Sequence, residues 1–200
     1  MNDQRRARLL EVIEQRVASV AVVFDAPYDP HNGAAVIRSC EALGVQRLHV
    51  VERAGVPFLV AHSVARGAEK WLDVTSYRDA SSAIAAARAG GLELIATHPD
   101  GELLPADLAA IPRLALVLGN ERDGIRKELA DACSRAVQVP MRGFVESLNV
   151  SVTAAICLQA ATSGRPGDLN ATEKRRLYAR GLYFSVNRAD DVLSAESKGS

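Results

Sequence analysis

The chain has 200 residues, with 24 basic (Lys and Arg) and 24 acidic (Asp and Glu) side chains, so its formal net charge is zero. Its hydrophobic content of 48% excludes an intrinsically disordered chain. No apolar run approaches the roughly 20 residues of a membrane-spanning helix. Residues 1–16 are too charged for a secretory signal. We therefore expect one soluble, cytoplasmic domain with short additions and no membrane contact.

Short apolar runs alternate with helical segments along most of the chain. The predicted strands are 20–24, 48–51, 92–96, 114–118 and 136–139. Several are apolar at consecutive positions, which is typical of strands covered on both faces in a parallel sheet. The predicted helices are 34–43, 79–89, 125–133 and 147–161. This alternation predicts an α/β fold with a doubly wound parallel sheet.

Both ends depart from that pattern. Residues 2–16 form a predicted amphipathic helix with an apolar side and an exposed arginine side that includes Arg16. Residues 163–167, with two glycines and a proline, are a predicted linker, and residues 189–200 are expected to fray. Residues 163–188 carry six basic and two acidic side chains, a net charge of +4. Either a solvated helix or a surface that binds nucleic acid accounts for this charge.

The cysteines show no metal-binding spacing. Cys40, Cys133 and Cys157 are far apart and lie in apolar helical surroundings. We interpret them as small buried side chains, and we expect no metal site.

The first polar cluster follows strand 20–24. Two prolines stiffen its loop, and Asn32 is predicted to cap the helix that follows. Arg38 comes six residues later on that helix, among small and apolar neighbours. The spacing leaves two interpretations of Arg38: a structural ion pair, or a contact with an anionic ligand.

Two more polar clusters follow predicted strands. In 118–125, Gly119 and Gly124 permit tight turns around an amide and three charged side chains, a pattern that by itself is more typical of a solvated loop. In 139–152, Ser147 is predicted to cap a helix whose first turn contains Asn149 and Ser151 and faces an anion or a carboxylate. Because ligands collect at the carboxyl ends of strands in open α/β sheets, we expect the three clusters to form one site.

In this order and spacing, the segments 32–38, 118–125 and 140–151 resemble the SpoU branch of the SPOUT superfamily of RNA 2′-O-ribose methyltransferases. The likeness runs from about residue 20 to residue 161 and is strongest to the TrmH type, which methylates guanosine-18 in the tRNA D loop. It implies an N-terminal basic helix (1–18), a Rossmann-like parallel-sheet SPOUT domain with a C-terminal trefoil knot (19–162) and a basic C-terminal extension (163–200).

The resemblance also implies a homodimer that binds S-adenosylmethionine at the knot and RNA, with tRNA favoured, without a metal. Knot loops then replace the GxGxxG loop that the sequence lacks. The residues implied to hold the cofactor are Thr97, Leu118, Gly119, Val139, Met141 and Leu148.

The catalytic residues implied by the resemblance are Arg38, Asn32, Glu121, Ser147 and Asn149. A guanidinium is a poor base because its pKa exceeds about 12. We therefore favour a role in which Arg38 holds the RNA phosphate and stabilises the alkoxide, with proton acceptance as the alternative. Arg38 could serve the cofactor of its own subunit or of the partner. Expected RNA contacts outside the reaction centre are Arg5, Arg6, Arg8, His31, Lys174, Arg175, Arg176 and Arg180.

Three alternative functions remain. An rRNA 2′-O-methyltransferase of the same branch would share every catalytic residue. A non-catalytic RNA-binding knot protein is disfavoured because the implied catalytic set is complete. A Rossmann-type small-molecule enzyme is disfavoured because its glycine fingerprint is missing.

Overall fold

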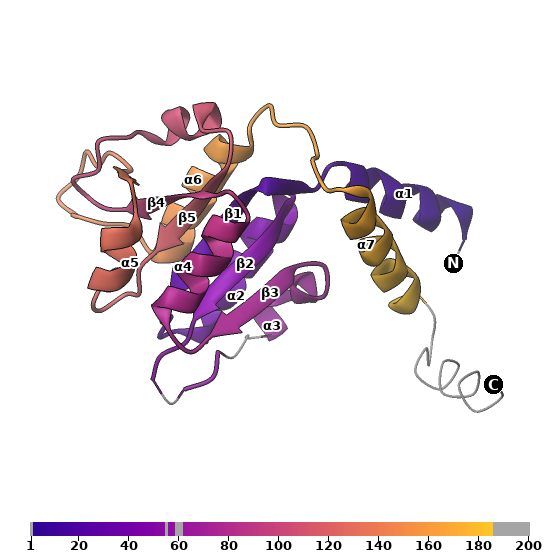
Figure 1. Cartoon of the computed structure of the whole chain (residues 1–200), viewed down its shortest axis with the longest axis horizontal. Helices are drawn as coiled ribbons and strands as arrows, with labels where there is room; N and C mark the ends of the chain where they lie inside the picture. Colours follow the sequence, from indigo (N-terminus) through magenta and orange to yellow (C-terminus); the bar gives the residue numbers. More distant parts are fainter. Residues whose placement is uncertain (1, 55, 59–61, 186–200) are drawn as a thin grey trace.

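The computed structural model of the protein describes residues 2–54, 56–58 and 62–185. Six parallel strands form one sheet in the order β3-β2-β1-β5-β4-β6 (Figure 1). This confirms the predicted parallel sheet. The strands are β1 (Val17–Asp25), β2 (Val45–Val51), β3 (Asp73–Tyr77), β4 (Glu93–Thr97), β5 (Leu114–Leu118) and β6 (Arg135–Val137).

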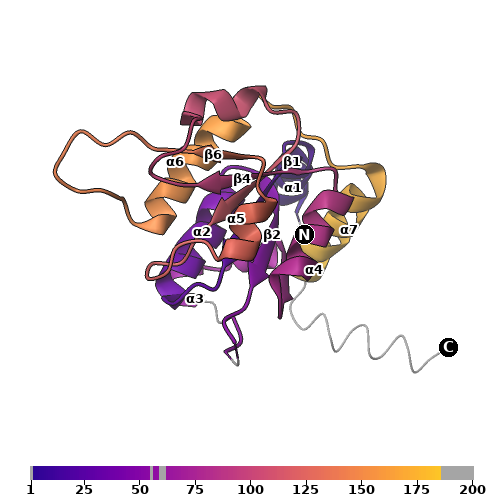
Figure 2. The ribbon, with the colours of Figure 1, turned by 60° about the vertical axis from the view of Figure 1, so that its left-hand side comes forward.

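Helices cover both faces of the sheet (Figure 2). One face packs on α2 (Pro30–Ala42), α6 (Val150–Thr162) and the 3-10 helix η2 (Pro105–Ala110), with α3 (His62–Ala65) and the 3-10 helix η1 (Ala68–Lys70) beside α2. The other face packs on α4 (Ala80–Ala89) and α5 (Lys127–Ala132). All nine residues of β1 are buried, which explains the uninterrupted apolar run at 20–24.

Two further helices pack together beside the sheet, α1 (Asp3–Glu14) and α7 (Ala171–Tyr183) (Figure 1). They share a small core that includes Ile13 and Leu177. The end of the predicted linker packs closely on α1. A side chain at Gly167 would collide with the backbone carbonyl of Glu14. Next to it, the carboxylate of Asp168 accepts hydrogen bonds from the first residues of β1. Residues 186–200, which include the segment expected to fray, lie outside the described residues.

Two of the differences from the sequence-based elements concern β3 and the start of α2. Strand β3 was not predicted, because it is an edge strand whose residues are only partly buried and mostly polar. The N-cap of α2 is Asp29 and not Asn32: the Asp29 carboxylate accepts from the backbone N–H of His31, and Pro30 begins the helix. The hydrogen bonds that the Asp29 carboxylate accepts from the backbone and the side chain of His31 lower its pKa. No helix within the described residues is long and apolar enough to cross a membrane.

The prediction of an exposed Arg16 is wrong. Helix α1 ends at Glu14, and Arg16 turns inward with only 1% of its surface exposed. Its guanidinium donates to the side chain of Gln46 at 2.8 Å and to the carbonyls of Glu41 and Trp71, each at 3.0 Å. Burial lowers the pKa of Arg16. This side chain therefore ties the start of β1 to β2 and to the segment before β3.

We expect Arg16→Ala to lower the free energy of unfolding by about 3 kcal/mol, because it leaves buried acceptors without a donor. Urea denaturation followed by circular dichroism measures this change. The matched control is Arg6→Ala, an exposed arginine on α1, for which a change within about 0.5 kcal/mol is expected. Equal stability of the two variants would contradict a structural role for Arg16.

Candidate functional site

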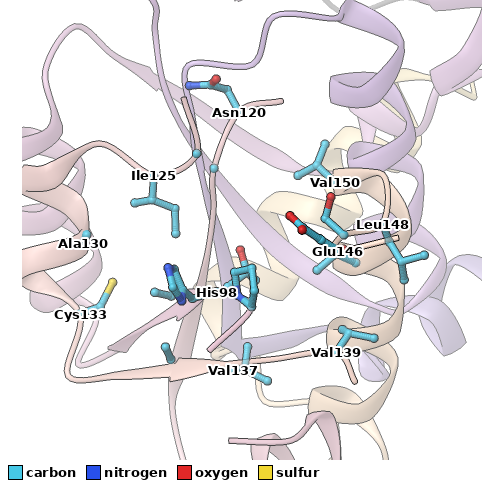
Figure 3. A pocket seen from close by; sticks show the side chains of 18 of the residues that line it. His98, Asn120, Ile125, Ala130, Cys133, Val137, Val139, Glu146, Leu148 and Val150 are labelled. Carbon is cyan, nitrogen blue, oxygen red and sulfur yellow. The ribbon is translucent and has the colours of Figure 1, made fainter. Parts of the chain in front are cut away.

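A cavity of about 1030 Å³ opens at the carboxyl ends of β4, β5 and β6. Its walls come from the segments that follow these strands, including 119–125 and 146–150 (Figure 3). Ile125 and Cys133 lie on one side of the cavity, Leu148 and Val150 on the other, and His98 between them (Figure 3). The second and third predicted clusters therefore share one cavity.

The structure places five of the six predicted cofactor residues at this cavity. Leu118 is the exception: it is fully buried in β5, just before the cavity wall begins. The hydroxyl of Thr97 donates to the carbonyl of Val117 at 3.0 Å and so joins β4 to β5. The five lining residues are Thr97, Gly119, Val139, Met141 and Leu148.

The loop after β5 is closed on itself. The backbone of Asn120 exchanges two hydrogen bonds with that of Gly124, at 3.0 and 3.2 Å, and its side chain accepts from two N–H groups inside the loop. Gly124 has a left-handed φ of +69°. A Cβ atom on Gly119 would lie 2.4 Å from the carbonyl carbon of Gly124. The tight turn predicted at Gly124 is confirmed, and at Gly119 the structure shows a close approach of two backbone segments.

Three predicted catalytic residues, each from a different polar cluster, form one hydrogen-bonded chain. The amide nitrogen of Asn32 donates to the carboxylate of Glu121 at 2.5 Å, and its oxygen accepts from the amide of Asn149 at 3.0 Å. Asn32 is buried, at 9% exposure. The three clusters therefore meet, as the sequence predicted.

Asn149, and not Ser147, is the N-cap of α6. Its side-chain oxygen accepts from the backbone N–H of Ser151 at 2.8 Å and from the Ser151 hydroxyl at 2.7 Å. Helix α6 begins at Val150, later than predicted, because the side-chain oxygen of Asn149 accepts from the free backbone N–H of Ser151 in the first turn. Ser147 is exposed and lines the cavity.

Arg38 is exposed on α2, and its guanidinium has no hydrogen bond or ion pair with any described residue. A structural ion pair within the described chain is therefore excluded, and the guanidinium is available to a ligand. His31, also exposed, contacts the Asp29 carboxylate at 3.0 Å through its ring nitrogen.

A buried ion pair that the sequence analysis missed connects the first two clusters. The fully buried carboxylate of Asp25 accepts from the backbone N–H of Arg126 at 2.7 Å and from its guanidinium at 2.6 Å. This pair fixes the loop after β5 beside the loop after β1. The available signal was a single acidic residue directly after an apolar strand.

The segment after β4 is a second feature that the sequence analysis missed. Gly101 packs against the backbone of β6, where a Cβ atom would lie 2.7 Å from the carbonyl carbon of Val137. Glu102 accepts from the backbone N–H of Ala136 at 3.2 Å, and it lines the cavity. Cys133 also lines the cavity, and burial raises its pKa to about 11. Among the described residues, no group of three or more His, Cys, Asp or Glu side chains could hold a metal.

The remaining predicted RNA contacts lie on α1 and α7, at the far end of the molecule from α5 (Figure 1). Arg176 and Arg180 both bind the carboxylate of Asp73 at 2.8 Å, and Lys174 binds Glu14 at 2.5 Å. These three side chains therefore hold α7 in place. Arg176 is nevertheless exposed, as are Arg5, Arg6, Arg8 and Arg175.

Comparison with known proteins identifies similar sequences. Residues 19–159 match the model of the SpoU rRNA Methylase family. The chain is 31% identical over 166 residues to the tRNA (guanosine(18)-2′-O)-methyltransferase of Escherichia coli K12, covering 82% of this chain and 72% of that protein. It is 32% identical over 152 residues to the 23S rRNA (guanosine-2′-O-)-methyltransferase RlmB of Coxiella burnetii, covering 75% and 61%.

Solved structures show the same fold. The TrmH/SpoU tRNA modifying enzyme of Aquifex aeolicus superposes with a TM-score of 0.81 at 26% identity, covering 93% of this chain and 98% of that chain. The SpoU methyltransferase AviRb of Streptomyces viridochromogenes, in complex with the cofactor AdoMet, gives a TM-score of 0.60 at 26% identity, covering 76% and 60%.

We expect Gly119→Ala to lower the free energy of unfolding by about 2 kcal/mol, because the new methyl group would overlap the backbone of Gly124. Gly143→Ala is the matched control, since a Cβ atom there meets nothing within 4 Å. Thermal denaturation compares the two variants. Equal midpoints would show that the loop after β5 tolerates a side chain at its first position.

Proposed function

The chain belongs to the SpoU rRNA methylase family, and on this premise we propose that it transfers a methyl group from S-adenosylmethionine to a ribose 2′-hydroxyl of RNA. The proposed target is guanosine-18 in the tRNA D loop, in line with the names of relatives about 30% identical over most of both chains. The observation that carries the proposal is the Asn32–Glu121–Asn149 chain beside a large cavity, with Arg38, unpaired among the described residues, on the helix that contains Asn32.

The cavity fits S-adenosylmethionine. Ile125, Val139 and Leu148 offer apolar cover for an adenine ring. The carboxylate of Glu146 points into the cavity (Figure 3) and suits a ligand that carries positive charge. When bound, the cofactor supplies an electrophilic methyl group.

The chain's own residues must position the RNA and stabilise the charge that appears on the ribose oxygen. We assign this role to Arg38, whose fork suits a phosphate and whose charge stabilises a developing alkoxide. Glu121 and Asn149 hold Asn32 in the first turn of α2 and so orient the helix that carries Arg38. Ser147 lies at the cavity wall as a further polar contact. Proton acceptance by Arg38 remains the alternative mechanism.

We also propose that the C-terminal part forms a trefoil knot within residues 19–162. Two observations support it: β6 pairs with β4 rather than with its chain neighbour β5, and α6 then returns to pack against α2 on the opposite face from α5. The separate core of α1 and α7 supports treating 1–18 and 163–200 as additions to this domain.

A homodimer is the proposed assembly. Exposed apolar side chains follow the cavity wall into α6: Phe144 is fully exposed, and Val152 and Ile156 are 45% and 37% exposed. Such a patch next to the site suits burial against a second copy of the chain. In that assembly, Arg38 could reach the cofactor of either subunit.

We propose that the exposed arginines of α1 and α7 contact RNA phosphates independently of the RNA sequence. The proposed location of the enzyme is the cytoplasm. Arg5, Arg6 and Arg175 are exposed and have no ion pair with a described residue, whereas Arg8 binds Glu11 and both Arg176 and Arg180 bind Asp73. We therefore expect the first group to contribute more to RNA affinity than the second.

Methylation of rRNA is the second candidate function, favoured by the similarity to the enzyme from Coxiella burnetii. Transfer of a labelled methyl group to total tRNA and total rRNA, followed by mapping of the modified ribose, separates the two. We expect label in tRNA at guanosine-18. Label confined to rRNA would establish the alternative, and label in neither would overturn the proposed function.

Arg38→Ala should reduce single-turnover methyl transfer by on the order of a hundredfold, because the guanidinium stabilises charge that appears only in the transition state. Thermal stability should not change, since Arg38 is exposed and unpaired among the described residues. Arg38→Lys should restore little activity if the bidentate fork matters. The control is Arg88→Ala, an exposed arginine on α4.

Near-normal turnover by Arg38→Ala would remove Arg38 from the mechanism. Loss of folding in that variant would instead show a structural role for its side chain.

A further inference from the structure

Two guanidinium groups lie over the ring of Tyr28, in the loop between β1 and α2. The central carbon of the Arg53 guanidinium is 4.4 Å from the ring centroid, and that of Arg122 is 4.5 Å away. Arg53 follows β2, and Arg122 lies in the loop after β5. Because β2, β1 and β5 are parallel neighbours, all three loops leave the same edge of the sheet.

Neither guanidinium has a hydrogen-bond or ion-pair partner within residues 2–54, 56–58 and 62–185. The nearby carboxylates contact Tyr28 instead. Glu121 accepts from its backbone N–H and Asp123 from its hydroxyl, both at 3.3 Å. Stacking on a ring leaves the N–H donors at the edge of a guanidinium free. Both cations therefore lie against one ring, and their donors have no partner among the described residues.

This pair of arginines is directly connected to the proposed reaction site. Glu121 contacts Tyr28 through one carboxylate oxygen and Asn32 through the other. An RNA strand whose ribose reaches this site must bring its neighbouring phosphates to the surrounding loops. A phosphate bound by both forks would form charge-assisted hydrogen bonds and relieve the repulsion between the two cations.

We propose that Arg53 and Arg122, held over the ring of Tyr28, bind a backbone phosphate of the RNA strand that flanks the methylated ribose. The inference rests on the proposed function and adds a binding site to it. Tyr28 is a positioning residue in this site, since it contacts the arginines and not the phosphate.

The test measures binding of the full-length protein to a fluorescently labelled, unmodified tRNA transcript over a series of salt concentrations. Arg53→Gln and Arg122→Gln should each weaken binding about tenfold. Each should also reduce the slope of log affinity against log salt by about one. Arg88→Gln, the matched control on α4, should leave affinity and slope unchanged.

Variants of Tyr28 test the positioning role. Tyr28→Phe keeps the ring and should bind tRNA as the wild type does. Tyr28→Leu removes the ring while both charges remain. It should therefore weaken binding less than the double variant that combines Arg53→Gln with Arg122→Gln, with little change in salt slope. Wild-type binding by Tyr28→Leu would exclude the positioning role.

The outcomes separate this site from the proposed function. An unchanged salt slope in the double variant overturns the phosphate site. If affinity falls without a change in slope, the arginines stack on a base of the RNA. If only thermal stability falls, they connect the loops structurally. Arginine-dependent binding together with no methylation of any RNA would leave the phosphate site standing and overturn the proposed function. Calorimetric binding of S-adenosylhomocysteine should be equal in all variants.

Discussion

The site depends on the interaction between the buried carboxylate of Asp25 and Arg126. Asp25 lies at the end of the central strand, and removal of a charge from water is costly unless strong hydrogen bonds compensate. Arg126 supplies two of them, one from its backbone and one from its guanidinium. Because α5 begins directly after Arg126, this pair anchors the whole loop after β5 beside the loop after β1.

The Asn32–Glu121–Asn149 chain follows from that anchor. Glu121 reaches Asn32 only because the two loops are held side by side, and Asn149 joins them as the cap of α6. Asn149 thus ends the hydrogen-bonded chain and caps helix α6. The loops provide a rigid frame, and exposed cationic side chains around it remain available to an anionic ligand.

Two groups of arginines in this protein differ in their partners. Arg16 and Arg165 donate to backbone carbonyls and hold segments together, Arg165 at the end of η2. The guanidinium groups of Arg38, Arg53 and Arg122 have no hydrogen-bonding or charged partner among the described residues, and phosphate is the ligand that their geometry suits. Sequence alone does not separate these groups, because the residue type is the same in both.

Apolar runs, glycines and caps are local signals, and they predicted the parallel α/β fold and the three polar loops. They did not reveal β3, whose edge position relaxes the apolar pattern, or the cap at Asn149, since Ser147 is an equally good capping residue. Which charges are already paired is visible only in the folded chain. Arg176 and Arg180 meet Asp73 more than 100 positions away, and Arg122 meets Tyr28 across two adjacent strands. Such pairings depend on strand order and helix packing, which bring distant residues together and leave no local trace in the sequence.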